Sequence, residues 1–200
     1  MLKTNTRHVI GISGFARSGK DTLARFLASE LRNLGLNVKI LSFAFPLKKD
    51  MDSFCMSKFG ISAFSEDSEL KAKIRPLLIA YGACQRQLTE GKYWLNKLKV
   101  EVDNFFSNNG NVVIVPDLRF KEFKFDEFDL IKSYSGNTIV TVSKTLECGK
   151  QNSAAHESEL KNFPFFLKNS NLNIDWTTSN NKEYLSSKAS QCLKILNLET

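Results

Sequence analysis

The residues best placed to do chemistry form one glycine-bearing run near the start of the chain, Gly14-Phe-Ala-Arg-Ser-Gly19-Lys20-Asp21-Thr22. Its glycines and lysine fit the phosphate-loop pattern GxxxxGK. Glycines let the backbone curl so that successive N–H groups point at phosphate oxygens, and the lysine adds a positive charge at the β- and γ-phosphates. The alternative is a glycine-rich turn with an incidental lysine. The run therefore predicts a binding site for the phosphates of ATP, formed by Gly14, Ala16, Arg17, Ser18, Gly19, Lys20, Asp21 and Thr22.

The residue after Lys20 departs from this pattern. Asp21 stands where Ser or Thr is usual, and Thr22 supplies the hydroxyl one position later. An acid beside phosphates repels them unless it faces a cation, so Asp21 and Thr22 are candidate contacts to Mg²⁺. An equally good alternative is that Asp21 is an acidic residue in the first turn of a helix, where the helix dipole favours it.

A second candidate group follows an apolar run, Val112-Val-Ile-Val-Pro-Asp117-Leu-Arg119. A continuous apolar run is typical of a strand that is buried on both faces. Ligands of open α/β sheets bind at the carboxyl ends of such strands, and in phosphate-loop enzymes an acid there holds Mg²⁺. We expect Asp117 to be a metal ligand and Arg119 to reach a phosphate. The catalytic set predicted from sequence is Lys20, Arg17, Asp117 and Arg119.

The pattern around these residues predicts an α/β fold. A strand over 8–13, the loop, a helix over 21–34 and a strand over 37–42 make one βαβ unit, which implies a parallel sheet. Helical spacing or composition then predicts helices over 46–59, 69–88, 92–106 and 182–196, and strands over 112–115, 138–143 and 172–176. The segment 144–155 is polar and is expected to be a loop. We expect one domain with a helical insertion after the second strand.

Composition limits the class of protein. The 200 residues carry a net charge of +7, which favours anionic partners. There is no run of five basic residues, so nucleic acid is not the expected partner. The cysteines, at 55, 84, 148 and 192, form no CxxC pair, as in proteins of the reducing cytoplasm. The early apolar run is too short to span a bilayer. We expect a cytoplasmic protein that binds small phosphorylated molecules and no membrane.

Several stretches, in order, resemble the bacteriophage deoxynucleoside monophosphate kinases. They are Arg17-Ser-Gly-Lys-Asp-Thr22, Ser42-Phe-Ala-Phe-Pro-Leu-Lys48, Arg75-Pro-Leu-Leu-Ile-Ala-Tyr-Gly82 with Arg86 and Trp94, Asp117-Leu-Arg119-Phe120, and His156-Glu-Ser-Glu159. Each is only moderately specific, and the ordered set is much more so. The resemblance spans positions 9 to about 160.

The resemblance implies a phosphate-loop, three-layer sandwich with a parallel central sheet. Its core would be 1–45, 110–143 and 170–200, with a nucleoside-monophosphate-binding insertion over about 46–109 and a lid over about 144–160. It implies transfer of the γ-phosphate of ATP to a deoxynucleoside monophosphate, with Mg²⁺, giving the diphosphate and ADP. The residues implied for acceptor binding are Lys48, Arg75, Arg86, Trp94 and Glu159. Core packing for Trp94 and a surface charge for Arg75 remain open alternatives.

Other readings of the sequence stay open. No arginine follows Arg119, so a lid could offer only Lys144 and Lys150 to the phosphates. Just past that loop, His156 and Glu159 are candidates for a lid hinge or a substrate contact, whereas Ser158 favours a capped helix start. Dephospho-coenzyme A kinase or another small-molecule kinase has the same type of core. The charge also permits an ATP-dependent nucleic-acid-binding protein, and a nucleotide-binding regulator without turnover is a third alternative. The sequence does not indicate which base is accepted, and a homodimer is compatible with it.

Overall fold

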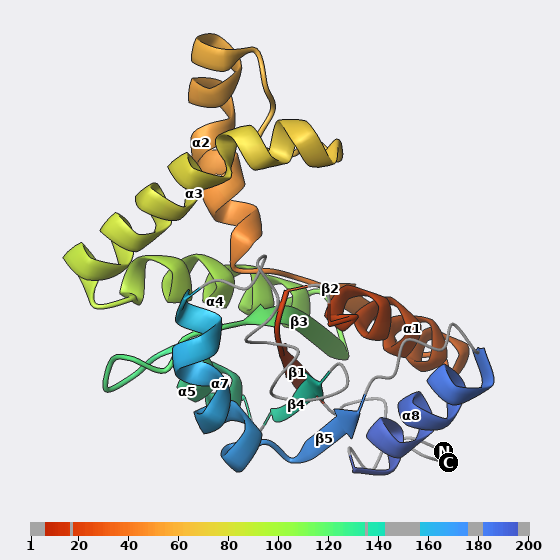
Figure 1. Ribbon diagram of the computed structural model, residues 1–200. Coiled ribbons are helices and arrows are strands. Elements are labelled where there is room, and N and C mark those ends of the chain that lie inside the picture. Colours follow the sequence, from red (N-terminus) through yellow and green to blue (C-terminus); the bar gives the residue numbers. More distant parts are fainter. Residues whose placement is uncertain (1–6, 17, 135, 143–156, 176–181, 196–200) are drawn as a thin grey trace.

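The computed structural model describes residues 7–16, 18–134, 136–142, 157–175 and 182–195 (Figure 1). Three consecutive helices lie between the second and third strands, where a helical insertion was expected. In chain order the elements are β1 (His8–Ser13), α1 (Lys20–Asn33), β2 (Val38–Ile40), α2 (Ala44–Phe59), α3 (Ser68–Thr89), α4 (Lys92–Ser107), β3 (Val112–Leu118), α5 (Glu127–Ser133), β4 (Asn137–Val142), α7 (Glu157–Asn169), β5 (Leu172–Asp175) and α8 (Lys182–Ile195).

The strands form one parallel sheet in the order β2-β3-β1-β4-β5. This confirms the predicted α/β fold with a parallel sheet. β1 lies in the centre and pairs with β3 on one side and β4 on the other. Because parallel strands end at the same edge of a sheet, the loop after β1 and the end of β3 lie side by side.

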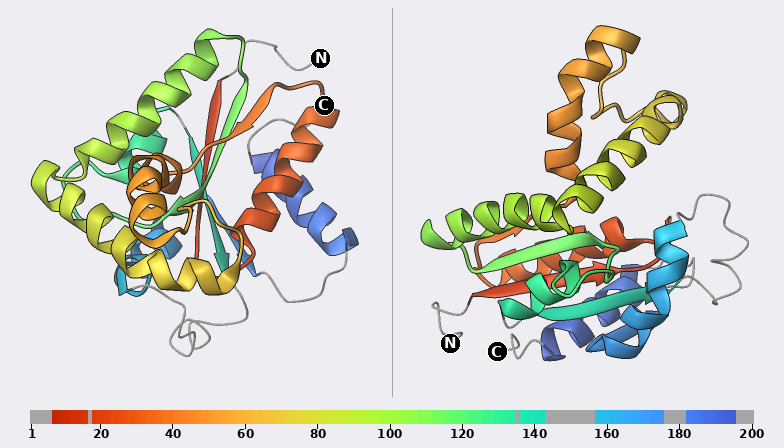
Figure 2. Two further views of the ribbon diagram at one scale, coloured as in Figure 1. Left: turned by 90° about the horizontal axis from the view of Figure 1, so that it is seen from above. Right: turned by 90° about the vertical axis from the view of Figure 1, so that its left-hand side faces the viewer.

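Helices cover both faces of the sheet and make three layers (Figure 2, left). Alternate strand residues point to opposite faces. Ile10 and Ile114 join one apolar cluster with residues of α1 and α8, such as Leu27 and Cys192. The neighbouring strand residues, including Val9 and Val113, join a second cluster with residues of α4, α5 and α7, among them Leu98, Ile131 and Phe166. Every strand that carries a candidate site residue is therefore fixed by packing on both sides.

The expected insertion, about 46–109, consists of two different parts. α2 and the first part of α3 project from the core as an arm (Figures 1 and 2), and Cys55 is the only buried residue that α2 contributes among the described side chains. α4 instead lies on the sheet, with Trp94, Leu95 and Leu98 in the second core cluster. We call α2 and the first part of α3 the arm from here on.

α5 had no counterpart among the predicted helices, and for α7 only a helix start at Ser158 was predicted. α5 begins at a capping box: the Asp126 side chain accepts the backbone N–H of Asp129, and the Asp129 side chain accepts the backbone N–H of Asp126. α7 occupies the chain from Glu157 onward, so it takes in the end of the expected lid. The rest of that lid, with Lys144, Lys150 and His156, lies outside the described residues.

Candidate active site

The phosphate loop connects the central strand β1 to α1, as predicted. Gly14 and Gly19 have positive φ angles of 152° and 90°, which residues other than glycine adopt rarely. Gly19 precedes the first turn of α1 and has no side chain to cap it. The first N–H groups of α1 therefore remain available to an anion at this end of the helix. Arg17, expected to bind ATP and to act in catalysis, lies outside the described residues.

Lys20 is folded back onto this loop. Its Nζ donates hydrogen bonds to the carbonyl oxygens of Gly14 at 2.8 Å and Phe15 at 2.6 Å. The residue is only 8% exposed. Burial lowers the pKa of Lys20, and Glu159 opposes that effect as the strongest of the nearby negative charges. The loop therefore holds a desolvated cation beside its own amides.

Asp117 lies at the end of β3, next to the phosphate loop. Its carboxylate accepts the N–H groups of Phe43 at 3.0 Å and Ala44 at 2.9 Å, so it caps the start of α2. Burial raises the pKa of Asp117, the two N–H bonds oppose this rise, and the negative charge of Asp21 adds to it. The sequence predicted a carboxylate at this place, and the structure adds its contact with the arm.

The carboxylates of Asp21 and Asp117 suit a divalent cation that is also held by phosphates. They repel each other, and a cation between them would relieve that repulsion. Among the described residues no three His, Cys, Asp or Glu side chains gather to hold a metal alone. Mg²⁺ in phosphate-transfer sites typically uses one or two carboxylates together with substrate phosphates and water. Asp21, Thr22 and Asp117 would fit that arrangement.

Arg119 and Glu159 complete the group around the loop. The Arg119 guanidinium lies 3.5 Å from Oε1 of Glu159, and Oε2 of Glu159 accepts the N–H of Ala16 at 2.9 Å. The side chain of Glu159 is 2% exposed. The sequence placed Glu159 among the acceptor-binding residues. In this structure it contacts the phosphate loop and Arg119.

The other residues expected on the acceptor side lie in different surroundings. Arg75 is an exposed residue of the arm, and Lys48 of α2 lies over the ring of Phe64. Trp94 is buried, and its Nε1 donates to the carbonyl oxygen of Gly82 at 3.2 Å, which agrees with the core-packing alternative. Trp94 therefore packs α4 against α3.

Arg86 is buried in a network of carboxylates. Its Nη2 lies 2.8 Å from Asp126 and its Nη1 3.7 Å from Glu127, and its guanidinium stacks 3.7 Å from the centre of the Phe120 ring. With 4% of the residue exposed, the guanidinium is already satisfied by protein groups. The resemblance implied an acceptor contact, whereas this structure shows a link between α3 and the start of α5.

Glu127 is a site-supporting residue that the sequence reasoning missed. Its Oε2 accepts the backbone N–H groups of Arg119 at 2.7 Å and Phe120 at 3.1 Å. It therefore fixes the backbone that carries the Arg119 side chain. A signal was present in the acidic residues Asp126, Glu127 and Asp129, whose clustering is typical of a helix start.

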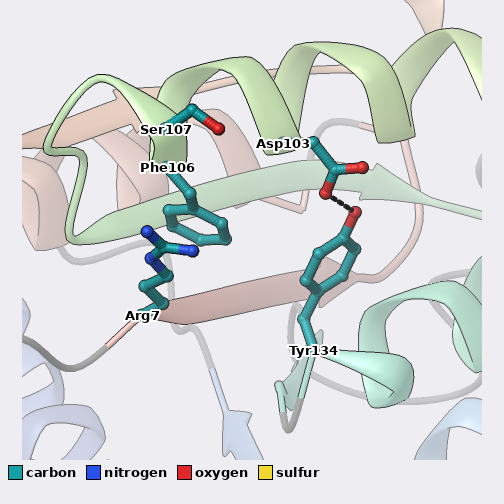
Figure 3. A pocket seen from close by; sticks show the side chains of 5 residues that line it. All are labelled: Arg7, Asp103, Phe106, Ser107 and Tyr134. Atoms are coloured by element: carbon teal, nitrogen blue, oxygen red, sulfur yellow. Dashed lines mark hydrogen bonds between the residues drawn. The ribbon is translucent and has the colours of Figure 1, made fainter.

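A separate small pocket lies near the start of β1 (Figure 3). The pocket has a volume of about 270 Å³. It is lined by Arg7, which precedes β1, and by Asp103, Phe106, Ser107 and Tyr134. The Tyr134 hydroxyl donates to Asp103 at 2.6 Å, and Arg7 lies over the Phe106 ring. Because none of the predicted site residues lines it, this pocket is not the candidate active site. Among the described helices, none is long and apolar enough to cross a membrane.

No family model and no curated protein matched the sequence. Solved structures do match. The crystal structure of TT1252 from Thermus thermophilus has a TM-score of 0.51 and 16% identity, over 98% of this chain and 100% of that one. Shikimate kinase from Bacteroides thetaiotaomicron has a TM-score of 0.49 and 14% identity, covering 96% and 99%. Mycobacterium tuberculosis APS kinase CysC with AMPPNP and APS has a TM-score of 0.45 and 11% identity, covering 96% and 98%. At these identities the similarity concerns the fold alone, a parallel sheet flanked by helices.

Proposed function

We propose that this protein is an ATP-dependent phosphotransferase that transfers the γ-phosphate to a deoxynucleoside monophosphate. The observation that carries the phosphotransfer is the position of Lys20, which is folded onto a glycine loop at the central strand with Arg119 and three carboxylates in electrostatic contact. The choice of acceptor rests on the ordered sequence stretches shared with the phage kinases.

The donor half of the reaction uses the loop directly. When the triphosphate enters, Lys20 exchanges the carbonyl oxygens of Gly14 and Phe15 for phosphate oxygens, and the amides at the start of α1 bind the same groups. Arg119 balances the charge that spreads over the transferred group. Mg²⁺, held by Asp21, Thr22 and Asp117 with the phosphates, would neutralise further charge. Phosphoryl transfer needs positioning and electrostatics and no protein nucleophile.

The acceptor half involves the arm. α2 starts at the Asp117 carboxylate, so the arm is attached beside the phosphate loop. Lys48 and Arg75 are the arm's candidates for the acceptor phosphate. We assign Arg86 and Trp94 an indirect part, since both are buried and bonded to protein groups. Their contribution is to hold α3 and α4 in place.

A second candidate is a kinase with a hydroxyl acceptor, such as dephospho-coenzyme A. The observation that favours it is Glu159, a buried carboxylate at the phosphate loop. A hydroxyl acceptor loses a proton on attack, and a positioned carboxylate can take that proton. A monophosphate acceptor needs no such base.

The test is a transfer assay with ATP and Mg²⁺. Each of the four deoxynucleoside monophosphates, dephospho-coenzyme A and single-stranded DNA is offered separately, and ADP and phosphorylated product are measured together. We expect diphosphate from at least one deoxynucleoside monophosphate, and a much lower rate of its formation with Lys20→Ala. Product from dephospho-coenzyme A alone supports the second candidate. ADP release that only DNA stimulates refutes both.

A further inference from the structure

Glu159 lies where an anion would be expected to bind. Its two oxygens contact the Ala16 amide of the phosphate loop and the Arg119 guanidinium, which are the kinds of group that hold phosphate. The side chain reaches them from α7, a helix far away in sequence. A carboxylate of the protein itself therefore contacts part of the proposed phosphate-binding apparatus.

The charges explain why this carboxylate is stable there. Lys20 is desolvated, and Glu159 opposes the resulting fall in its pKa more strongly than Asp21 or Asp117 does. Arg119 is also positive and opposes the charge on Lys20. Without Glu159, the repulsion between these two cations would have no buried countercharge to offset it. A buried anion that attracts both of them offsets that repulsion.

A bound nucleotide would take over the role of Glu159 in offsetting the positive charges of Lys20 and Arg119. Its phosphates bring several negative charges to Lys20 and Arg119, and like charges a few ångströms apart repel strongly where water is excluded. The phosphates and the Glu159 carboxylate then compete for the same partners, and Glu159 becomes the weaker ligand.

The packing of α7 gives this competition a mechanical consequence. One turn beyond Glu159, the ring of Phe163 lies 4.3 Å from the ring of Phe15 in the phosphate loop. Asn162 of the same helix accepts the N–H of Lys121, two residues after Arg119. The inner face of α7 therefore contacts both the loop and the segment that carries Arg119. Displacement of Glu159 would strain these contacts and shift the start of the helix.

We propose that Glu159 is a built-in competitor for the phosphate loop, which holds the place of a phosphoryl group in the empty protein and leaves it, with the first turns of α7, when a nucleotide binds. This rests on the proposed function, since it requires the loop to bind nucleotide phosphates. Arg119 is released to the phosphates only as Glu159 withdraws. Nucleotide affinity is correspondingly lower than the loop alone would provide.

The test compares binding of a non-hydrolysable ATP analogue with Mg²⁺ by titration calorimetry, without any acceptor. Glu159→Gln keeps the shape of the side chain and removes its charge. We expect about tenfold tighter binding than wild type, as loss of one like-charge contact in a partly screened site gives. Glu101→Gln removes one charge from an exposed residue of α4 and should leave affinity unchanged. Equal or weaker binding by Glu159→Gln overturns the proposal and leaves the proposed function standing.

A measurement on the wild-type protein makes the test independent of how the variant folds. Amide hydrogen exchange of residues 159–169 is followed with and without the analogue. We expect faster exchange in the first turns of α7 when the analogue is bound, and unchanged exchange overturns the proposal. If neither wild type nor variant binds the analogue, the loop is not a nucleotide site, and the proposed function fails together with this inference.

Discussion

Replacing Arg86 by alanine should reduce stability more than it affects the binding of any ligand. The guanidinium donates to both oxygens of Asp126, at 3.2 and 2.8 Å, and lies 3.5 Å from Glu122. The side chain of Asp126 is fully buried. Removing the arginine would leave that carboxylate with its charge but without a countercharge.

The size of the effect follows from the burial. Breaking a buried ion pair by removing one partner costs about 3–5 kcal/mol, because the remaining charge stays desolvated. The stack on Phe120 is lost as well. A domain is stable by about 5–15 kcal/mol in total. With about 2–4 °C per kcal/mol for a chain of this size, the melting temperature should fall by roughly 6–20 °C.

Urea unfolding followed by circular dichroism, with a thermal scan, measures this directly. Arg75→Ala is the matched control, since it removes an exposed arginine from the same helix and should change stability by about 0.5 kcal/mol or less. A stable Arg86→Ala protein with a raised Michaelis constant for the acceptor alone would refute the reasoning from burial. It would show that Arg86 leaves its carboxylates to hold substrate.

Three further changes test other parts of the structure. Lys20→Ala should lower the transfer rate by about 10²- to 10³-fold with an unchanged circular dichroism spectrum, and near-normal activity would remove the phosphate-loop assignment. Burial raises the pKa of Glu127 from 4.5 to about 8, so between these values the folded state binds more protons and the free energy of unfolding falls as pH rises. The urea midpoint of Glu127→Gln should therefore fall less than that of the wild type between pH 5 and pH 8. Equal falls in the urea midpoints of the two proteins would contradict this. Gly11→Ala would place a Cβ atom into the Leu118 side chain, and we expect a loss of about 1–3 kcal/mol in urea unfolding; no loss would mean that the end of the Leu118 side chain can move aside.

The sequence was sufficient for the strands and for the loop because their signals are local. The strand over 8–13 was predicted with the limits that the structure shows, and Gly14 to Lys20 follows it directly. The order of the strands was not predictable in the same way, because it depends on which distant segments pair. The extent of α7 beyond its start near Ser158 escaped prediction for another reason: Pro164 interrupts the helical pattern, yet it lies on the exposed side while Phe163 and Phe166 are buried.

The site residues also differ in whether a local sequence pattern could reveal their role. Lys20 and Asp117 could be assigned because each sits in a short pattern with a known position in parallel sheets. The partners of Arg86 and Glu159 are 40 and 143 positions away in the chain, at Asp126 and Ala16. Sequence resemblance marked both residues without showing what they touch. Their surroundings follow from the packing of α3, α5 and α7, which no local pattern describes.

Asp117 shows how the core and the arm depend on each other. The first residues of α2 have no cap from the helix itself, and the two N–H groups there are satisfied by the Asp117 carboxylate. The same carboxylate is close enough to Asp21 for the negative charge of Asp21 to raise its pKa. A cation that draws on Asp117 would therefore weaken its bonds to Phe43 and Ala44, since a carboxylate polarised toward a cation is a poorer acceptor elsewhere. The attachment of the arm and the charge beside the phosphate loop are in this way set by one side chain.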